Sequence, residues 1–311
     1  MKRFFDAPHD KEKRRVGWEK KHDSGYFDII RFFGPGKCNP SNIMIEYLPG
    51  IFTFRDPLLA EYSTEMEKRL RSDGRLYDGP TALMVAGFDP AANPPTMTVR
   101  EVNYGDVAGS SYTLDFKHPH FEKAGGTLRN YYKNKYPSHK IEDNPLANCL
   151  GVCGYLLVRE ENRIFLLQVI RSGRVASLEN TRGPSVAGGV DFVKGYRNLG
   201  EILDRALSEE IKEEVNLEPG EYKIIPLAFA REIFRGERPQ LFAAIETSLT
   251  REEVTDRMIN LKMKFRETDS FEFIPLHPDC TLDPTTLRTL NPEALMNYYL
   301  LEECLILTNQ K

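Results

Sequence analysis

The spacing of apolar and polar positions divides the second half of the chain into strands and helices. Strands are predicted wherever an apolar run is short and bounded by polar or turn residues. The predicted strands are residues 146–158, 164–171, 222–234, 239–247 and 271–276. A charged helix is expected at 250–262 and an amphipathic helix at 291–307, so this half of the chain is predicted to be an α/β unit.

The first half of the chain has a different pattern, in which one helix stands among short strands. The helix is predicted at 56–72 and the strands at 43–48, 81–88 and 96–104. Residues 104–116, rich in Gly, Ser and aromatic residues, are expected to form a solvent-facing turn, with a recognition loop as the alternative. These features predict a small α+β domain.

The polar segment 133–145 combines two prolines and high charge with no apolar period, which is typical of a domain boundary. We therefore divide the chain into an N-terminal α+β domain, residues 1–140, and a second domain, residues 141–311. Residues 1–24 are polar and basic without periodicity, and we interpret them as an adherent tail rather than a binding arm.

One helix of roughly four turns is predicted between residues 198 and 217. Asn198 followed three residues later by Glu201 is the pattern of a capping box, and Pro219 with Gly220 supplies the stop. The apolar stripe of this helix consists of residues four apart, namely Leu203, Leu207, Ile211 and Val215. The helix is therefore expected to pack this face against the rest of the protein.

The acidic residues of this helix lie where an ordinary surface helix would not place them. Glu210, Glu213 and Glu214 fall at the edge of the apolar stripe or within it, so their carboxylates are predicted to face the protein. Glu209 with Glu213 is one of two like-charge pairs a turn apart, each costing about 0.2–0.5 kcal/mol in an isolated helix. Divalent ions bound by these carboxylates would compensate their repulsion and explain their placement. The alternative is a charged amphipathic helix with no metal-binding or catalytic role.

The spacing of this segment resembles the Nudix box of the Nudix hydrolases, which cleave a nucleoside diphosphate linked to another group. Gly195 is followed after five residues by Glu201, and after seven more residues by EEIKEEVNL. Two positions depart from the family pattern, because Glu209 stands where Arg is usual and Asn216 where Gly is usual. The resemblance implies an α/β fold, the Nudix α/β/α sandwich with a mixed sheet, over roughly residues 145–280, preceded here by the smaller α+β domain.

Outside the box the chain resembles one branch of this family, the UDP-sugar pyrophosphatases that carry an N-terminal domain. The similarity lies in LYDGPTALMVAGF, VREVNYGDVAGSSY, GPSVAGGVDF and AFAREIFRGERPQLFAAIETSLTREEV, and in the EVNL ending of the box. The resemblance implies an enzyme that uses Mg2+ (Mn2+ is the alternative) to cleave UDP-glucose or UDP-galactose to UMP and sugar 1-phosphate. Two other hypotheses stay open: a hydrolase of an ADP-sugar, dinucleotide or coenzyme A, and a catalytically weak nucleotide-binding module, suggested by the absent Arg at position 209.

The chemistry of diphosphate hydrolysis suggests roles for the acidic residues. Glu210 and Glu214, one turn apart, are the first candidates for metal ligands. Glu213 is predicted to be a third ligand or the general base, and the Gly195 carbonyl a further donor. Glu267, in the loop before the last predicted strand, is the second candidate for the base, with a plain loop acid as the alternative.

The predicted substrate contacts are arginines and glycines near the box. They are Arg171, Arg174, Arg182, Arg231, Gly188 and Gly189. The three arginines between residues 171 and 182 can hold phosphate oxygens bidentately, and a solvated loop is the alternative. Arg231 is expected to contact phosphate or uracil. The two glycines let the backbone come close to a ligand or to the facing helix.

Composition excludes several other classes of function. A formal charge of -4 gives no field that would attract nucleic acid or an anionic membrane, so neither partner is expected. The five cysteines show no metal-ligand spacing and are expected to be reduced and buried. The chain has no apolar run of membrane-spanning length and no secretion signal, which predicts a cytoplasmic protein with a small-molecule substrate. The sequence leaves the oligomeric state undetermined.

Overall fold

The computed structural model describes residues 27–34, 37–76, 79–138, 140–171, 178, 180–261 and 268–308, and the structural statements below concern these residues. The predicted tail at residues 1–24 lies outside them, as do Arg174 and Glu267 of the predicted site. The described chain forms two sheets, one of eight strands and one of three.

The larger sheet contains most of the strands predicted for the second half of the chain. Its strands are β1 (Phe27–Phe32), β5 (Gly151–Glu160), β6 (Arg163–Arg171), β7 (Arg182–Gly183), β8 (Val186–Gly189), β9 (Tyr222–Glu232), β10 (Arg238–Thr247) and β11 (Thr268–Pro275). They are ordered β1-β9-β10-β5-β6-β11, with β7 beside β6 and β8 beside β5. Because β10 runs parallel to β5 whereas β9–β10 and β5–β6 are antiparallel, the sheet is mixed.

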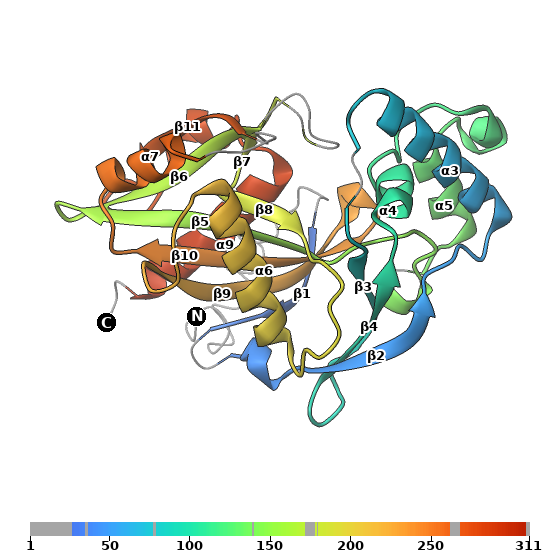
Figure 1. Cartoon of the computed structure of the whole chain (residues 1–311), viewed down its shortest axis with the longest axis horizontal. Helices are drawn as coiled ribbons and strands as arrows, with labels where there is room; N and C mark the ends of the chain where they lie inside the picture. Colours follow the sequence, from blue (N-terminus) through green and yellow to red (C-terminus); the bar gives the residue numbers. More distant parts are fainter. Residues whose placement is uncertain are drawn as a thin grey trace, which may run out of the picture.

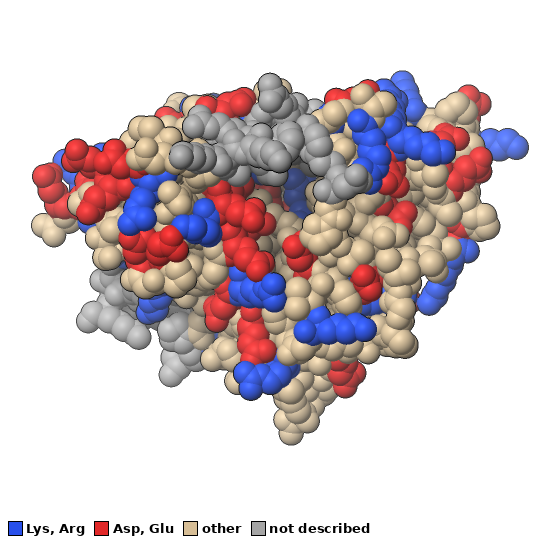
Figure 2. Space-filling view, in the orientation of Figure 1, with Lys and Arg blue, Asp and Glu red and all other residues tan. Residues whose placement is uncertain are grey.

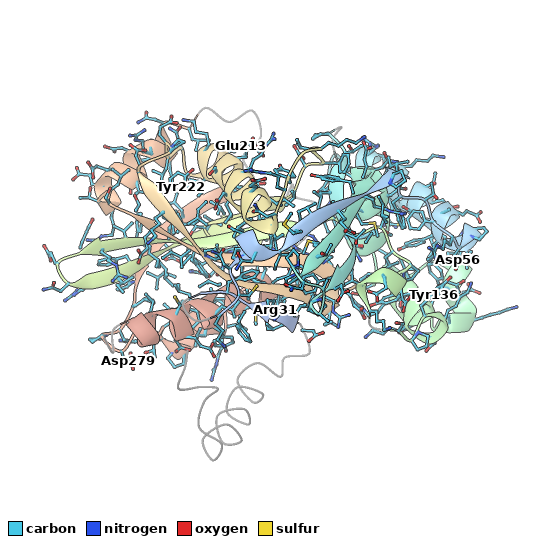
Figure 3. The ribbon with its side chains drawn as sticks, turned by 90° about the horizontal axis from the view of Figure 1, so that it is seen from below. Arg31, Asp56, Tyr136, Glu213, Tyr222 and Asp279 are labelled. Atoms are coloured by element: carbon cyan, nitrogen blue, oxygen red, sulfur yellow. The ribbon has the colours of Figure 1, made fainter. Side chains whose placement is uncertain are left out.

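Helices cover both faces of this sheet. They are α6 (Leu199–Glu214), α7 (Arg251–Ile259), α8 (Pro284–Leu287) and α9 (Pro292–Thr308). α6 and α7 pack on one face and α9 on the other, as Figure 3 shows from below. Along β5, Val152 and Leu156 are buried on the α6 face, whereas Cys153 and Tyr155 are buried on the α9 face. The predicted α/β/α sandwich with a mixed sheet is therefore confirmed.

The smaller sheet belongs to the first half of the chain and stands beside the sandwich (Figure 1). It is formed by β2 (Met44–Ile51), β3 (Ala82–Asp89) and β4 (Thr96–Val102), in the order β2-β4-β3. The helices of this part are α3 (Pro57–Ser72), α4 (Tyr104–Ser111) and α5 (Leu128–Lys135), with short 3-10 turns η1 (Pro40–Asn42), η2 (Pro119–Ala124) and η3 (Ile141–Asp143). The predicted α+β character of this part is confirmed.

One prediction for this part is wrong, because most of the expected solvent-facing turn at residues 104–116 is the helix α4. Two glycines a turn apart let α4 lie directly on α3. A Cβ at Gly109 would overlap the backbone of Ser63, and one at Gly105 would overlap the Glu67 carboxylate. The Gly- and Ser-rich composition therefore serves close helix packing, which outweighs the low helix propensity of glycine.

Main-chain hydrogen bonds join the smaller sheet to the sandwich. The Leu83 N–H of β3 donates to the Val190 carbonyl at 2.7 Å, and the Leu150 N–H donates to the Leu83 carbonyl at 2.7 Å. The Phe192 N–H donates to the Thr81 carbonyl at 2.8 Å. β1 also joins the larger sheet, although it lies within the predicted first domain. The division at residue 140 stays a prediction.

No helix in the described part of the chain is long and apolar enough to cross a membrane. All five cysteines are free thiols; Cys149, Cys153 and Cys280 are buried, as predicted, whereas Cys38 and Cys304 are half-buried.

Candidate functional site

Side chains cap the first turn of α6, and main-chain hydrogen bonds close its last turn. Asn198 Oδ1 accepts a hydrogen bond from the Glu201 N–H at 3.1 Å, as predicted, and Glu201 Oε2 accepts one from the Arg197 N–H at 2.8 Å. After the last turn, Asn216 has φ of +63° and donates its N–H to the Ile211 carbonyl at 2.9 Å. Asn tolerates this left-handed conformation better than most residues, which explains how it stands where the Nudix family usually has Gly.

The apolar stripe of α6 is buried as the sequence pattern predicts. Its members Leu203, Leu207, Ile211 and Val215 are all 0% exposed. Glu210 and Glu214 lie at the edge of the stripe and are half-buried, whereas Glu213 is exposed. We call Glu210 and Glu214 the acid pair. The expectation that the carboxylates face the protein therefore fits these two residues, while Glu213 stands on the outer side of the helix (Figure 3).

Two consecutive residues of β8 hold the acid pair. The Ala187 N–H donates to Glu214 Oε2 at 3.1 Å. The Glu210 carboxylate lies against the Cα of Gly188, where an added Cβ would come within 2.8 Å of both carboxylate oxygens. Gly188 therefore brings the backbone close to the facing helix, which is one of its two predicted roles. At Gly189, by contrast, a Cβ would meet no atom closer than 3.5 Å.

Acidic side chains gather along α6 in the middle of the face drawn in Figure 2. Glu209 forms an ion pair with Arg205, with Arg205 Nε 2.8 Å from Glu209 Oε1. Asp191 precedes the helix nearby, and its pKa is raised by burial and by the Glu209 carboxylate, an effect that Arg205 partly offsets. Acidic charge thus extends beyond the acid pair, and a cation arriving at this face enters a negative field.

Gly195 lies in the turn that precedes α6, at the end of the helix opposite to the acid pair, with φ of +109°. Tyr47 of β2 holds this turn. Its hydroxyl donates to the Val193 carbonyl at 3.2 Å and accepts from the Tyr196 N–H at 2.8 Å. Burial raises the pKa of Tyr47, so the hydroxyl keeps its proton at neutral pH. The predicted role of the Gly195 carbonyl as a metal ligand stays a prediction.

The predicted arginine contacts that the structure describes pack against other parts of the sandwich. Arg182 pairs with Glu272 of β11. Arg231 pairs with Asp28 of β1 and lies 3.2 Å from Glu237. The side-chain stem of Arg171 packs against Gly183, where a Cβ would lie 3.2 Å from it. Arg182 and Arg231 are therefore neutralised by carboxylates, and their contact with a substrate stays a prediction.

Sequence reasoning missed a group of charges on the α9 face of the sheet, which we call the buried charge cluster. It consists of Glu232, Arg235, Arg238 and Glu293, each less than 7% exposed. Arg235 Nη1 lies 3.3 Å from Glu232 Oε2 and 3.7 Å from Glu293 Oε2, and Arg238 Nη1 lies 3.4 Å from Glu232 Oε2. Arg238 also donates to the Gly188 carbonyl at 3.3 Å, so the cluster supports the strand that holds the acid pair.

The first half of the chain places the Tyr104 ring and a polar cavity next to β8. The Tyr104 ring approaches Gly189, since a Cβ there would lie 3.9 Å from Tyr104 Cε2. Beside it is a cavity of about 210 Å³ lined mainly by polar residues, namely Glu67, Arg71, Thr81, Asn103, Tyr104 and Asp106. Burial raises the pKa of Asp106, and a hydrogen bond from Asn103 opposes that effect. The sequence pattern placed a turn here and gave no sign of the cavity.

The acid pair suits a divalent ion of the Mg2+ class. Its donors are carboxylate oxygens one turn apart on a single helix, half-buried beside a strand. A carboxylate offers about four lone-pair sites, so the hydrogen bond from Ala187 leaves Glu214 able to bind an ion. Glu210 and Glu214 are therefore the residues that would hold the metal, and Gly188 keeps the space in front of Glu210 clear of a side chain.

The chain was compared with known proteins. Its sequence matches no protein-family model and no curated protein. Its structure is similar to the NUDIX domain of Shewanella oneidensis NrtR in complex with ADP ribose, with 16% identity and a TM-score of 0.37 over 56% of this chain and 98% of that one. It is also similar to a NUDIX hydrolase described as putative from Listeria monocytogenes, with 16% identity and a TM-score of 0.35 over 52% and 95%. A third similar structure is Caenorhabditis elegans Ap4A hydrolase, with 13% identity and a TM-score of 0.33 over 51% and 98%.

Proposed function

We propose that this protein is a Mg2+-dependent hydrolase of the Nudix type that cleaves a nucleoside diphosphate linked to another group. The observation that carries the proposal is the acid pair, two half-buried carboxylates held against consecutive residues of β8 within the spacing of a Nudix box. The sandwich supports it, because α6 rests on the sheet through a fully buried stripe and so fixes where the carboxylates point.

When bound, the metal would neutralise charge on the diphosphate oxygens and make a water molecule nucleophilic. The chain's own part is positioning. The Ala187 N–H orients the Glu214 carboxylate, and Gly188 lets the Glu210 carboxylate lie close to the strand. Among the residues that the structure describes, the exposed Glu213 on the outer side of α6 is the candidate for the general base that takes a proton from the attacking water.

The finer proposal is that the substrate is a UDP-hexose, cleaved to UMP and hexose 1-phosphate. It rests on the order of segments that resemble the UDP-sugar branch, including EVNL at the end of the box. Water should attack phosphorus, because a carboxylate-held metal stabilises charge on phosphoryl oxygens and gives no specific support to an oxocarbenium centre. In 18O-labelled water the label should appear on a phosphate oxygen of one product, whereas UDP and free sugar labelled at C1 would contradict the mechanism.

The deciding experiment is a hydrolysis screen with Mg2+ across UDP-glucose, UDP-galactose, an ADP-sugar, a dinucleotide and coenzyme A. We expect the UDP-hexoses to be cleaved fastest. Efficient cleavage of ADP-ribose with UDP-hexoses untouched would reject the substrate and keep the enzyme class. If bound UDP-glucose survives prolonged incubation with Mg2+, and no other compound is cleaved, the protein is a binding module, the hypothesis raised by Glu209 in place of Arg.

Glu267 stays a second candidate for the general base. It lies outside the described residues, in the segment just before β11. A positioned base typically contributes about 10²- to 10⁴-fold, so Glu267→Gln should lower kcat far more than it changes KM. If only KM changes, Glu213 becomes the preferred candidate.

A further inference from the structure

A second group of potential metal ligands lies in the first half of the chain, on α3 and η2, at the end of the molecule away from β11 and α7 (Figure 1). Glu61 and Glu65 stand one turn apart on α3, and His118 and His120 flank Pro119 at the start of η2. One ligand atom each from Glu65, His118 and His120 can be chosen so that all three lie within 4.8 Å of one another. This group is separate from the acid pair on α6.

The distances within the group are close to those of a tetrahedral zinc site. Zinc bonds of about 2.0–2.1 Å place neighbouring ligand atoms roughly 3.3–3.5 Å apart. His120 Nε2 lies 3.8 Å from Glu65 Oε1 and 3.7 Å from Glu61 Oε1, and His118 Nε2 lies 2.7 Å from Glu65 Oε2. Shifts of about half an ångström in long glutamate side chains would bring these atoms to zinc distances.

His120 gives an independent indication of a missing partner. Its Nε2 atom is buried and makes no hydrogen bond among the described residues, although it points toward two carboxylates. Buried polar atoms are nearly always paired, so an unpaired one calls for a ligand or an ion. An ion bonded to Nε2 and to the glutamate oxygens would satisfy this atom.

Packing holds both imidazoles in place before any ion arrives. The His118 ring meets the buried Tyr62 edge-on, with centroids 5.1 Å apart, and its centroid lies 4.5 Å from that of His120. Phe121, which follows directly, is fully buried against Tyr62. A rigid ligand set loses little entropy on binding, which favours affinity.

We propose that Glu65, His118 and His120, with Glu61 as the fourth donor, bind one transition-metal ion of the Zn2+ class. Two imidazole nitrogens distinguish this site from the all-oxygen acid pair, because imidazole suits zinc and its neighbours in the periodic table whereas Mg2+ prefers oxygen. The Nδ1 atom of His118 now accepts a long 3.3 Å hydrogen bond from the His120 N–H. A metal at His118 Nε2 would require the neutral tautomer with its proton on Nδ1, and this weak bond would then be given up.

The ion would join α3 to η2 and so stabilise the part of the molecule that bears Tyr104 and the polar cavity.

The test titrates Zn2+ by calorimetry into the full chain in excess Mg2+, which occupies sites made of oxygen ligands. The wild type should bind one more Zn2+ than the double variant His118→Ala/His120→Ala. At a free Zn2+ concentration a hundredfold above the Kd of this site, the melting temperature of the wild type should rise by about 4 °C. That of the double variant should stay nearly unchanged.

His277→Ala is the matched control, because it removes an exposed histidine from a loop after β11 and should leave the zinc stoichiometry unchanged. Glu65→Gln is the second variant, for use if the double variant fails to fold. It keeps the size of the side chain and removes only its charge. Co2+ bound at the site should give the absorption bands of a tetrahedral complex, and Glu65→Gln should weaken them at least tenfold. Equal zinc binding by the wild type and Glu65→Gln would overturn the proposal, as would a zinc ion lost only in Glu214→Gln, which would assign it to α6.

Discussion

The acid pair and the buried charge cluster lie on opposite faces of one sheet and hold their carboxylates in different ways. Glu214 is held by the main-chain N–H of Ala187, and Glu210 lies against the Cα of Gly188. Glu232, by contrast, is 0% exposed and lies 3.3 Å from Arg235 and 3.4 Å from Arg238. Both groups place carboxylates beside a sheet, and in the cluster these carboxylates lie next to the guanidinium groups of Arg235 and Arg238.

The difference separates carboxylates that support the fold from carboxylates that can bind an ion. In the cluster, burial and the nearby Glu293 carboxylate raise the pKa of Glu232, and the guanidinium groups of Arg235 and Arg238 offset that rise only in part. The Glu232 Oε2 atom has guanidinium partners within the cluster, whereas Glu232 Oε1 is buried without a hydrogen bond among the described residues. A backbone N–H, by contrast, orients a carboxylate without neutralising its full charge, so the Ala187 contact is compatible with a cation at Glu214. We therefore expect substitutions in the acid pair to affect turnover and substitutions in the cluster to affect stability.

The largest effect is expected from Glu214→Gln. The variant keeps the shape and can still accept the Ala187 N–H, but it loses the charge that would bind the metal. Metal catalysis is worth several kcal/mol, so kcat at saturating Mg2+ should fall at least about a thousandfold. The free energy of unfolding should stay the same or rise slightly, because repulsion between Glu210 and Glu214 decreases.

Glu209→Gln is the matched control on the same helix. Glu209 is exposed and paired with Arg205, so its loss should cost at most about 1 kcal/mol of stability and leave kcat within a few-fold of the wild type. Near-normal turnover by Glu214→Gln in limiting Mg2+ would contradict the assignment of metal binding and catalysis to the acid pair.

The next effect is expected from Arg238→Met, which removes a guanidinium group and keeps most of the apolar stem. Arg238 is 3% exposed and donates to the Cys149 and Gly188 carbonyls as well as to Glu232. Breaking a buried pair leaves an uncompensated charge, so the free energy of unfolding should fall by about 3–5 kcal/mol in denaturant titrations. Arg205→Met, which breaks the exposed pair with Glu209, should cost less than about 1 kcal/mol; equal losses would contradict the structural role of the cluster.

The sequence predicted α6 well because its signals are local. Asn198, Glu201 and the four-residue apolar stripe lie within one segment, and the cap and the buried face follow from their spacing. The contacts that make a site are distant in sequence. Ala187 and Glu214 are 27 residues apart, and Gly188 and Arg238 are 50 apart. A pattern along the chain contains no information about which strand these side chains meet.

The misread segment shows a second limit of sequence patterns. Gly105 and Gly109 indicated a turn by composition, but their spacing of four residues is also the spacing that lets two helices touch. Only the position of Ser63 on α3 decides between these meanings. The buried charge cluster was missed for a similar reason, since Arg235 and Arg238 lie in the short charged connection RGER between two predicted strands, which resembles an exposed turn.

Gly188→Ala tests the geometry of the acid pair without removing a charge. The added Cβ would overlap the Glu210 carboxylate, which must move away from β8. Small displacements of a group that positions the reacting atoms lower the reaction rate, so kcat should fall by about ten- to a hundredfold. Gly189→Ala is the matched control, because its Cβ would make only ordinary contacts with Cys149 Sγ at 3.5 Å and Tyr104 Cε2 at 3.9 Å. If both variants keep wild-type kcat, the position of Glu210 does not matter to the reaction.

The smallest effect is expected at Asp56, a third kind of carboxylate that caps α3 and is held by neutral and cationic donors (Figure 3). Burial raises its pKa, but hydrogen bonds from Lys135, Tyr131 and Tyr136 outweigh burial and leave the pKa below its ordinary value. The stabilisation from a lowered pKa is complete above the unfolded value of about 3.9 and is lost as pH falls through the folded value. Asp56→Asn keeps the cap and loses the charge, so it should cost about 1–2 kcal/mol at pH 7. Denaturant titrations from pH 7 to pH 3 should show this difference shrinking below about pH 4, and a difference that grows toward acid would show that the charged form of Asp56 does not stabilise the fold.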